Sequence, residues 1–470
     1  MAGQKGTVPL SRALGVTEEP SPSVPPIPDH LPSPLPSPYP LFIEVTDLRA
    51  ALPIIANHFH DRVWERVTTV GITGTKGKST TTYYVKGILD AWAAAEGRPR
   101  TAVLSSIDAY DGVLDHESFI TTPEIFELFQ HLANAEASGI QHLVMEVSSQ
   151  GLKYGRTTGV IFDIGCFLNI GEDHISPIEH PDAEDYFCSK LLLFSQCRTA
   201  VVNAAMDKAE RVMAAARAAL PEQCILTFST AEAVLAGLQS GAIEPLREAG
   251  VDGLRFEAFD RSTGEADSFA LGMTGTFNVE NALAAIAIAR ALGVPEEHIH
   301  QGLFEARVPG RMELFHAPNG AVILIDYAHN WMSFEQLFAS VETEYPGTRR
   351  TVLFGCPGYK AIGRRYELGT LSGRFCEMTY LTEEDAGEEP VEEICEEIAA
   401  FVAAEGGAYT IIPDREEAIH TALEDALADT SGKTVVMLTG KGRETRQKRG
   451  QEYVPVTSDL DIVLSFLEGC

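Results

Sequence analysis

The sequence predicts an α/β protein: a P-loop central domain on a parallel-rich sheet, then a C-terminal Rossmann-like α/β domain, both preceded by a proline-rich N-terminal arm. Three observations lead to this prediction. Short apolar segments alternate with helical ones from residue 45 onward, a glycine-rich loop joins an early apolar segment to a helix, and 11 of the 26 prolines fall within the first forty residues. Alternating strands and helices are typical of parallel sheets covered by helices.

The proline-rich arm is predicted over residues 1–44. Proline lacks a backbone N–H, and this segment shows no apolar periodicity, so we expect an extended or disordered arm. A ligand for a proline-reading domain is the functional alternative.

The central domain is predicted over residues 45–307. Its buried strands should be the short apolar runs, and helices are expected at 79–95 and 281–292. The strand candidates are residues 67–70, 102–105, 142–147, 164–170 and 200–203.

The C-terminal domain is predicted over residues 308–470 and repeats the alternation of strands and helices. The acidic run 383–405 should be mostly a solvated helix face, with Ile394, Ile398 and Val402 as its buried stripe. The strand candidates are residues 322–325, 351–354, 378–381, 410–412 and 435–438.

The bulk composition excludes several classes of protein. The formal net charge of -31 leaves no broad basic surface for nucleic acid or anionic lipid. No stretch approaches the roughly 18 apolar residues that a membrane span needs. The eight cysteines are scattered without metal-ligand spacing, which is typical of reduced cytosolic thiols. We therefore expect a cytoplasmic monomer that binds neither nucleic acid nor membrane.

A phosphate-binding loop is predicted at Gly71–Thr80, between a buried strand and a helix start. Glycines let backbone amides turn towards phosphates, Lys78 can reach the terminal phosphates, and Ser79 can offer a hydroxyl to magnesium. The usual pattern has a glycine where this chain has Ile72. A glycine turn with incidental lysines is the structural alternative.

Other candidate residues follow strand ends or begin helices. Glu146 ends a strand and suits a magnesium ligand, with a buried glutamate on a structural partner as the alternative. His174 follows an aspartate after another strand, and Lys190 lies on a helix, where a surface lysine is the alternative. The Thr-Thr-Pro run at 121–123 precedes a helix and, by itself, could be its N-cap.

Taken together, these motifs resemble those of the Mur ligases and their relatives the folylpolyglutamate synthases, across roughly residues 45–460. The resemblance implies an ATP-dependent ligase that activates a carboxylate as an acyl phosphate and joins an amino acid to it. It is carried by Thr73-Gly74-Thr75-x-Gly77-Lys78-Ser79, Thr121-Thr122-Pro123, Met145–Gln150, Asn169–His174, Gly275–Ala282, Val308–Glu313, Asp326–Asn330 and Gly440–Glu444.

The resemblance also implies roles for individual residues, with ATP and Mg²⁺ as cofactors and a carbamylated lysine at Lys190. Catalytic roles would fall to Lys78, His174, Lys190 and Arg311. Magnesium would be held by Ser79, Glu146, His174 and Lys190. The nucleotide would contact Gly74, Thr75, Lys76, Gly77, Lys78, Ser79, Thr80, Asn278, Asn281, Arg311 and Asp326. The acceptor and the amino acid would contact Thr121, Thr122, Ser148, Tyr154, Arg156, Arg365, Gly440 and Glu444. A helix cap is the alternative for Asn278, and a plain glycine turn for Gly440.

Within the family, the chain looks most like the enzymes that add an amino acid, L-lysine in particular, to a UDP-N-acetylmuramoyl dipeptide in peptidoglycan synthesis. Two departures are expected. The N-terminal UDP-binding domain would be largely missing, and Glu384-Asp385-Ala386-Gly387 replaces the amino-acid-reading motif. Two alternatives stay open: a Mur-type ligase for a non-UDP carboxylate, such as a natural-product or peptide precursor, and a nucleotide-binding protein without turnover.

Overall fold

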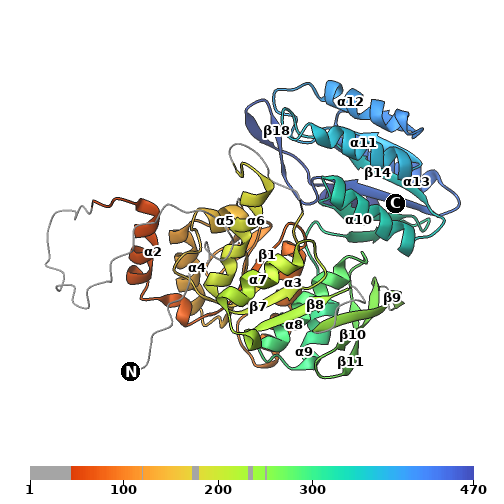
Figure 1. The fold of residues 1–470 in the computed structure, drawn as a ribbon. Coiled ribbons are helices and arrows are strands. Elements are labelled where there is room, and N and C mark those ends of the chain that lie inside the picture. Colours follow the sequence, from red (N-terminus) through yellow and green to blue (C-terminus); the bar gives the residue numbers. More distant parts are fainter. Residues whose placement is uncertain (1–43, 119, 172–178, 231–236, 249–250, 470) are drawn as a thin grey trace, which may run out of the picture. The chain divides into compact units, whose positions relative to one another are not determined.

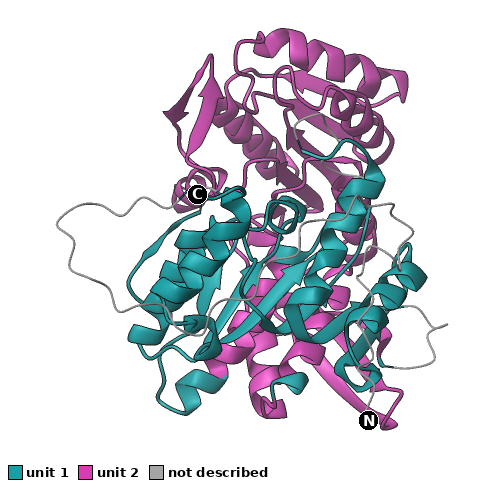
Figure 2. Ribbon diagram, turned by 60° about the vertical axis from the view of Figure 1, so that its left-hand side comes forward, with its two compact units in different colours: residues 1–78, 92–237, 290–292 teal, residues 79–91, 238–289, 293–470 magenta. Residues whose placement is uncertain are grey.

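The computed structural model describes residues 44–118, 120–171, 179–230, 237–248 and 251–469. They form a mixed α/β structure (Figure 1) that divides into two compact units, coloured separately in Figure 2. Unit 1 comprises residues 1–78, 92–237 and 290–292, and unit 2 comprises residues 79–91, 238–289 and 293–470. The predicted arm lies almost entirely outside the described residues.

A largely parallel set of strands forms the centre of unit 1, in the order β8-β7-β6-β1-β5-β2-β3-β4. Strand β1 (Thr68–Thr73) lies between β5 (His142–Glu146) and β6 (Phe162–Phe167) and is parallel to both. All five strands predicted for this region are present, with ends shifted by a few residues. The other strands are β2 (Ala102–Leu104), β3 (Asp108–Tyr110), β4 (Asp115–Glu117), β7 (Cys197–Asn203) and β8 (Ile225–Ser229).

Helices bury apolar stripes against these strands. On α4, Leu128, Phe129 and Leu132 recur at helical spacing and join Leu143 and Met145 of β5 in one buried cluster. Every residue of β5 is buried, as expected for a parallel strand covered on both faces. The helices of unit 1 are α2 (Leu48–Phe59), α4 (Ile125–Ala137), α5 (Ser149–Lys153), α6 (Ala183–Leu191) and α7 (Ala209–Ala219), with 3-10 turns at Val63–Glu65, Leu192–Gln196 and Glu222–Cys224. Helix α3 (Lys78–Ala95) belongs to unit 2 over residues 79–91 and to unit 1 at its two ends.

Unit 2 contains a six-stranded sheet in the order β12-β13-β17-β14-β15-β16. Only the edge strand β12 runs antiparallel to its neighbour. The five strands predicted here are all present. The strands are β12 (Glu313–His316), β13 (Val322–Asp326), β14 (Arg349–Phe354), β15 (Met378–Leu381), β16 (Tyr409–Ile411) and β17 (Thr434–Thr439), followed by the hairpin of β18 (Arg446–Arg449) and β19 (Glu452–Pro455).

Helices cover both faces of this sheet. Leu353 of β14 joins a buried cluster with α13 and α14, whereas the next residue, Phe354, meets Phe334 of α10 with ring centroids 5.2 Å apart. Successive strand residues point to opposite faces, so the sheet is packed on both sides. Helices α11 and α12 pack against each other (Figure 1). The helices are α10 (Trp331–Glu344), α11 (Gly363–Phe375), α12 (Val391–Ala404), α13 (Arg415–Ala428) and α14 (Asp459–Glu468).

The acidic run of unit 2 is only partly as predicted. The stripe Ile394, Ile398 and Val402 is buried on α12, which confirms the helical spacing. The expectation of a solvated face is wrong at the start of the run, because Glu383 and Glu384 are only 6% and 8% exposed. Glu383 and Glu384 follow the buried strand β15 and precede α12, so the helical spacing of α12 does not apply to them.

Unit 2 also holds an antiparallel meander that was not predicted, β9 (Leu238–Glu248), β10 (Val251–Asp260) and β11 (Glu265–Leu271). The sequence pattern that could have predicted it is the alternation of apolar residues, as at Leu254, Phe256 and Ala258, which are all buried. Helices α8 (Asn278–Ala291) and α9 (Glu296–Glu305) follow, and α8 begins three residues before the predicted start.

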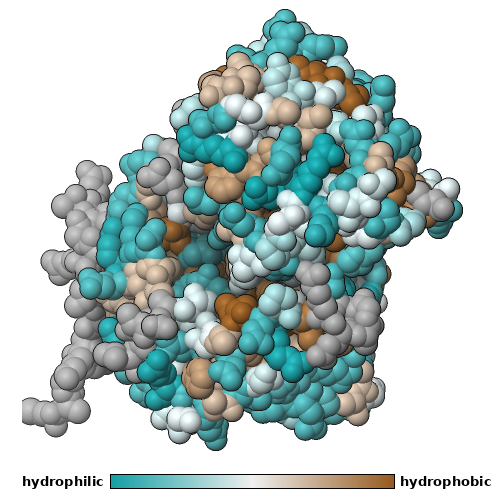
Figure 3. Space-filling view, turned by 90° about the vertical axis from the view of Figure 1, so that its right-hand side faces the viewer, coloured by the Kyte–Doolittle hydropathy of each residue, from teal (hydrophilic) through white to brown (hydrophobic). Residues whose placement is uncertain are grey.

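Among the described helices, none is both long and apolar enough to cross a membrane. Hydrophilic residues cover most of the face shown in Figure 3, with hydrophobic residues in small groups among them.

Candidate functional site

The predicted phosphate loop joins β1 to α3 in residues 74–77, and two of its positions require glycine. Gly77 has φ of 79°, in the left-handed region that side chains disfavour. A Cβ at Gly74 would lie 2.9 Å from the Cβ of Leu168, closer than packed carbon atoms approach. The loop backbone is therefore shaped by close contact as well as by turn geometry.

Asn169, which follows β6, holds the loop in place. Its Oδ1 accepts a hydrogen bond from the Lys76 amide at 2.9 Å, and its Nδ2 donates to the Lys76 carbonyl at 3.1 Å. The Thr75 amide also donates to the main-chain carbonyl of Asn169 at 3.2 Å. Sequence reasoning assigned this segment to metal binding and missed the clamp, although its position after a strand next to β1 could have indicated it.

Two lysines converge on one carbonyl of the loop. Lys78 Nζ donates to the carbonyls of Gly74 at 3.0 Å and Thr75 at 3.2 Å. Lys190 Nζ, from α6, donates to the same Gly74 carbonyl at 2.9 Å. Lys190 is only 1% exposed, so its alternative reading as a surface lysine is wrong. Two cations beside a loop at a helix start form a site suited to phosphate.

Tyr186 completes this corner of unit 1. Its hydroxyl donates to Thr75 Oγ1 at 3.1 Å, and Lys190 Nζ lies 4.7 Å from its ring centroid. Tyr186 and Lys190 are four residues apart on α6, which places both on one face of the helix. Tyr186 was not singled out from the sequence.

Glu146 lies at the same edge of the sheet as the loop. It pairs in register with Ile72 of β1, two residues before Gly74, and is 1% exposed. Its Oε1 accepts hydrogen bonds from Ser106, from the amide at 2.9 Å and the hydroxyl at 3.1 Å. The structural partner therefore exists, and a carboxylate beside a phosphate loop still matches the oxygen ligands that magnesium prefers.

Of the other predicted loop and metal residues, the structure describes Ser79 and Thr80 but not His174. Ser79 and Thr80 lie in the first turn of α3, and both are buried. His174 lies outside the described residues.

Thr122 joins the Thr-Thr-Pro run to the end of β5. Its Oγ1 accepts from the Ser148 amide at 2.9 Å and donates to the Glu146 carbonyl at 3.1 Å. A Cβ at Gly151 would lie 2.8 Å from Thr122 Cγ2, so α5 approaches Thr122 closely. Ser148 itself caps α5 by accepting from the Gly151 amide at 3.0 Å. The predicted residues Thr122 and Ser148 are thus in direct contact.

The helix-cap reading of the Thr-Thr-Pro run is wrong. Glu124 caps α4 through a reciprocal pair of hydrogen bonds with Glu127. Arg156 pairs with Glu124 at 2.8 Å and donates to the Thr122 carbonyl at 3.3 Å. Arg156 therefore lies beside Thr122 as expected, while Thr121 is half-buried.

Tyr154 follows α5 and lines a cavity of about 230 Å³ together with Arg49, Glu124 and Arg156. The Arg49 guanidinium stacks over its ring at 4.6 Å. Two predicted substrate residues, Tyr154 and Arg156, therefore line the same cavity in unit 1.

A Ser149–His180–Asp185 chain links α5 to α6. His180 Nε2 lies 2.9 Å from Ser149 Oγ, and Nδ1 lies 2.6 Å from Asp185 Oδ2. The order of groups is that of a hydrolase triad, but Ser149 is 4% exposed and His180 fully buried. Asp185 also pairs with Lys153 at 2.6 Å. We interpret the chain as a structural link that holds the helix carrying Lys190.

In unit 2, the two predicted asparagines begin α8 and bind one another. Asn281 Nδ2 donates to Asn278 Oδ1 at 3.2 Å, and Asn278 Nδ2 donates to the Thr274 carbonyl at 2.6 Å. Thr81 Oγ1 donates to Asn281 Oδ1 at 3.4 Å. A capping side chain accepts from backbone amides, whereas that of Asn278 donates to a carbonyl, so these bonds differ from the capping alternative.

Asp326 ends β13 and organises the segment around Arg311. Its carboxylate accepts from the amides of Met312 at 2.9 Å and Ala328 at 2.8 Å. Burial raises the pKa of this carboxyl, while the Arg311 charge and the two amides act in the opposite direction. The Arg311 guanidinium lies 4.6 Å from the ring centroid of Tyr327, the residue after Asp326.

Tyr327 connects Arg311 to the loop after β17. Its hydroxyl donates to Glu444 Oε1 at 2.6 Å, and burial raises the pKa of the phenol. Lys441 Nζ pairs with Glu444 Oε2 at 2.5 Å and with Asp385 at 3.1 Å. The predicted residue Glu444 therefore stands in a network that the sequence did not reveal.

Gly440 lies directly against the side chain of Glu384. Its φ is 97°, and a Cβ there would overlap the Glu384 carboxylate. The turn at Gly440 is therefore also the place where the buried side chain of Glu384 packs against the backbone. Burial raises the pKa of Glu384 to about 7, although the charges of Arg415 and Lys441 oppose the shift.

The ion-pair partners of Arg365 are different from the residues that Glu444 contacts. Its guanidinium pairs with Glu389 at 2.7 Å and Glu397 at 2.6 Å, and its side chain is 3% exposed. These two ion pairs raise the pKa of Arg365. The structure therefore places this predicted substrate residue of α11 in an ion cluster with Glu397 of α12 and with Glu389, which precedes α12.

Comparison with protein-family models finds two matches. The Mur ligase middle domain matches residues 72–289, and the Mur ligase, glutamate ligase domain matches residues 310–442.

Curated relatives extend over most of the chain. It is 35% identical over 431 residues to the UDP-N-acetylmuramoyl-L-alanyl-D-glutamate–L-lysine ligase of Enterococcus faecalis, covering 91% of this chain and 82% of the relative. It is 37% identical to the UDP-N-acetylmuramyl-tripeptide synthetase of Lactococcus lactis subsp. cremoris, covering 90% and 83%.

Solved structures share the fold at lower identity. A folylpolyglutamate synthase of Mycobacterium tuberculosis, complexed with ADP and AMPPCP, has a TM-score of 0.63 at 16% identity, covering 83% of this chain and 92% of that one. A UDP-N-acetylmuramoylalanyl-D-glutamyl-2,6-diaminopimelate–D-alanyl-D-alanyl ligase of Acinetobacter baumannii has a TM-score of 0.61 at 18% identity, covering 92% and 82%.

Proposed function

Since the chain belongs to the Mur ligase family of ATP-dependent amide-bond ligases, we propose that it joins a free amino acid to a carboxylate of UDP-N-acetylmuramoyl-L-alanyl-D-glutamate. This would be a step of peptidoglycan synthesis. The two curated relatives support this acceptor, because their names give a muramoyl-dipeptide substrate and a tripeptide product. Lysine is the first amino acid to test, since one relative is named for it.

One observation carries the proposal: Lys78 and Lys190 meet at the Gly74 carbonyl, and Glu146 stands at the same sheet edge. Phosphoryl transfer needs a cation at the phosphates, which Lys78 would supply, a carboxylate for magnesium, and little covalent chemistry from the protein. A binding protein without turnover has no need for a second buried lysine at such a loop.

The first step transfers a phosphoryl group. An oxygen of the acceptor carboxylate attacks the γ-phosphorus of ATP, the bond to the β-bridging oxygen breaks, and ADP leaves. Lys78 would exchange its loop carbonyls for phosphate oxygens and neutralise the charge that develops on them. Magnesium, which the family uses with ATP, supplies further charge neutralisation, and Glu146 with Ser79 would hold it.

The second step forms the amide. The amine nitrogen of the incoming amino acid attacks the acyl-phosphate carbonyl, the carbon–oxygen bond to phosphate breaks, and the nitrogen loses a proton. Thr122, Ser148 and Arg156 would hold the acceptor, because they contact one another beside the end of β5. The nucleotide roles of Asn278, Asn281, Arg311 and Asp326, and the amino-acid roles of Arg365, Gly440 and Glu444, belong to this proposal.

A carbamate on Lys190 is the finer part of the proposal. Carbon dioxide adds to a neutral amine with loss of a proton, which converts a cation into an anion able to bind a metal. The position of Lys190 supports this, because the side chain is buried and its Nζ lies at the Gly74 carbonyl of the phosphate loop, where magnesium would bind. With ¹³C-labelled bicarbonate, the protein should show a carbamate carbon resonance that Lys190→Ala removes and Lys433→Ala, at an exposed lysine, retains. A spectrum identical in all three proteins would refute the carbamate.

Phosphate release from ATP tests the overall function. It should require magnesium, UDP-N-acetylmuramoyl-L-alanyl-D-glutamate and one amino acid of a panel, and mass spectrometry should find the corresponding tripeptide. Silence from folded protein that binds ATP would contradict this acceptor and indicate a different, non-UDP carboxylate.

A further inference from the structure

A buried carboxylate at the end of α10 binds the backbone just before α8. The Gly275 amide donates to Glu344 Oε1 at 2.8 Å. Glu344 is the last residue of α10 and is 4% exposed, and Gly275 is also buried. Glu344 lies in the stretch that matches the glutamate ligase domain, whereas Gly275 lies in the stretch that matches the middle domain. The bond therefore joins the two family domains within unit 2.

A second contact comes from the same face of α10. Ser340 is four residues before Glu344, which places both side chains on one side of the helix. Its hydroxyl lies 3.4 Å from Thr276 Oγ1, and Ser340 is 1% exposed. Helix α10 thus contacts two successive residues, Gly275 and Thr276.

The contacted residues form a tight turn. Gly275 has φ of 93°, in the left-handed region, and a Cβ there would lie 3.0 Å from ring atoms of Phe277. The Asn278 amide donates to the Gly275 carbonyl at 2.7 Å and closes the turn. The orientation of Gly275 therefore determines how the chain enters α8.

One peptide group, between Thr274 and Gly275, is bound on both sides. Its N–H donates to Glu344 Oε1, and its carbonyl accepts from Asn278 Nδ2 at 2.6 Å. Because a peptide group is planar, a rotation that turns the N–H away from Glu344 also turns the carbonyl away from Asn278. The position of the Asn278 side chain therefore depends on Glu344.

Asn278 passes this restraint on towards the phosphate loop. Its Oδ1 accepts from Asn281 Nδ2 at 3.2 Å, and Asn281 Oδ1 accepts from Thr81 Oγ1 at 3.4 Å. Thr81 lies in the first turn of α3, the helix that follows the loop. A continuous series of polar contacts thus joins α10 to α3.

We propose that Glu344 is a positioning residue for ATP, acting through the peptide group between Thr274 and Gly275. This inference rests on the nucleotide role proposed above for Asn278 and Asn281. Without its acceptor, the buried Gly275 N–H would lose its partner, and the peptide group would rotate towards another one. Asn278 would then be released, and ATP binding would have to restore the bound arrangement, which lowers affinity.

Calorimetric titration of the full chain with ATP and magnesium, without acceptor, tests the proposal. Glu344→Leu keeps the size of the side chain but removes the acceptor, and it should weaken ATP binding by about tenfold. Glu344→Gln should retain most of the affinity, because its amide oxygen can still accept from Gly275. Glu335→Leu, at an exposed glutamate of the same helix, is the matched control and should bind ATP like the wild type.

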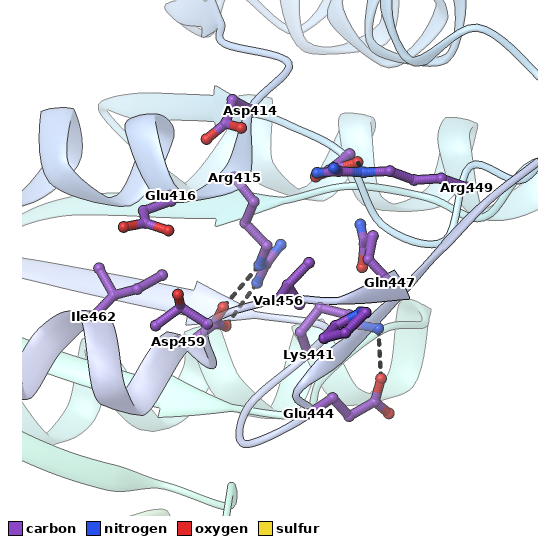
Figure 4. A pocket seen from close by; sticks show the side chains of 13 residues that line it. Asp414, Arg415, Glu416, Lys441, Glu444, Gln447, Arg449, Val456, Asp459 and Ile462 are labelled. Atoms are coloured by element: carbon purple, nitrogen blue, oxygen red, sulfur yellow. Dashed lines mark hydrogen bonds and ion pairs between the residues drawn. The ribbon is translucent and has the colours of Figure 1, made fainter. Parts of the chain in front are cut away.

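The phosphate-release assay separates positioning from a purely structural role. Glu344→Leu should raise the KM of ATP and leave the KM of the amino acid nearly unchanged. The reason is that Glu344 is not among the described residues that line the cavity of about 510 Å³ beside Glu444 (Figure 4), a proposed amino-acid contact. A purely structural role would reduce the amount of active enzyme and leave both KM values as they are.

Hydrogen exchange of the wild type gives a measurement that needs no variant, and it decides if Glu344→Leu does not fold. An ATP analogue that cannot transfer its γ-phosphate should slow amide exchange at residues 340–345 as well as at 274–281. Protection confined to 274–281, or equal ATP affinity of folded Glu344→Leu and wild type, overturns the proposal. A wild-type chain that binds no ATP overturns the proposed function, and this inference with it.

Discussion

The substitution Glu384→Gln would test whether burial raises the pKa of the Glu384 carboxyl, which packs against Gly440. Glu384 is 8% exposed at the end of β15, and burial raises the pKa of its carboxyl from 4.5 to about 7. Arg415 and Lys441 oppose the shift without cancelling it. Glutamine keeps the shape of the side chain and removes its titration.

The direction of the effect follows from proton binding. Between pH 4.5 and about 7, the folded protein retains a proton on Glu384 that the unfolded chain has released. The stability from this group is therefore fully present below pH 4.5 and is lost as the pH rises through about 7. A pKa difference of roughly 2.5, at about 1.4 kcal/mol for each pH unit, corresponds to a loss of about 3 kcal/mol.

Urea denaturation at pH 5 and pH 8, followed by circular dichroism, measures the effect as a difference between variant and wild type. From pH 5 to pH 8, the free energy of unfolding of Glu384→Gln should rise by up to about 3 kcal/mol relative to that of the wild type. The reason is that only the wild type must ionise a buried carboxyl. Glu396→Gln, at an exposed glutamate of α12, is the matched control and should show no comparable change. A difference between Glu384→Gln and wild type that is independent of pH, or that moves the other way, refutes the reasoning.

Three further substitutions test the loop and a buried ion pair. Lys78→Ala should lower phosphate release by about 100-fold or more with unchanged circular dichroism, and substantial remaining activity would contradict its role. Gly74→Ala should weaken ATP binding in calorimetry by about tenfold or more, because its Cβ would lie 2.9 Å from Leu168; unchanged affinity would show that the loop adapts. Arg415→Leu leaves Asp459 buried without its partner and should lower the free energy of unfolding by about 3–5 kcal/mol, which Asp459→Leu in the same chain should partly restore.

Local sequence patterns determined much of the fold. The phosphate loop at Gly71–Thr80 could be placed because glycines, a lysine and a hydroxyl at fixed spacing follow an apolar run. The buried stripe on α12 followed from its spacing in the same way. The meander β9–β11 was missed, although apolar residues alternate along β10 at Leu254, Phe256 and Ala258.

The site depended more on tertiary structure. Sequence reasoning left Lys190 open between a surface and a buried role, and its contact with Gly74, 116 residues away, decides for burial. The acids Glu383 and Glu384 were expected in solvent, yet packing after β15 buries them. Glu344 gave no signal at all, because its contact with the Gly275 amide, 69 residues away, is recognisable only in the folded chain.

The sequence by itself thus determined ten strands of the two parallel-rich sheets, the phosphate loop and the family, since these depend on residues close together in the chain. The tertiary structure decided which charged and polar side chains are buried and what they contact. The physical reason is that desolvation and hydrogen bonding depend on neighbours from distant parts of the chain, which no local pattern encodes.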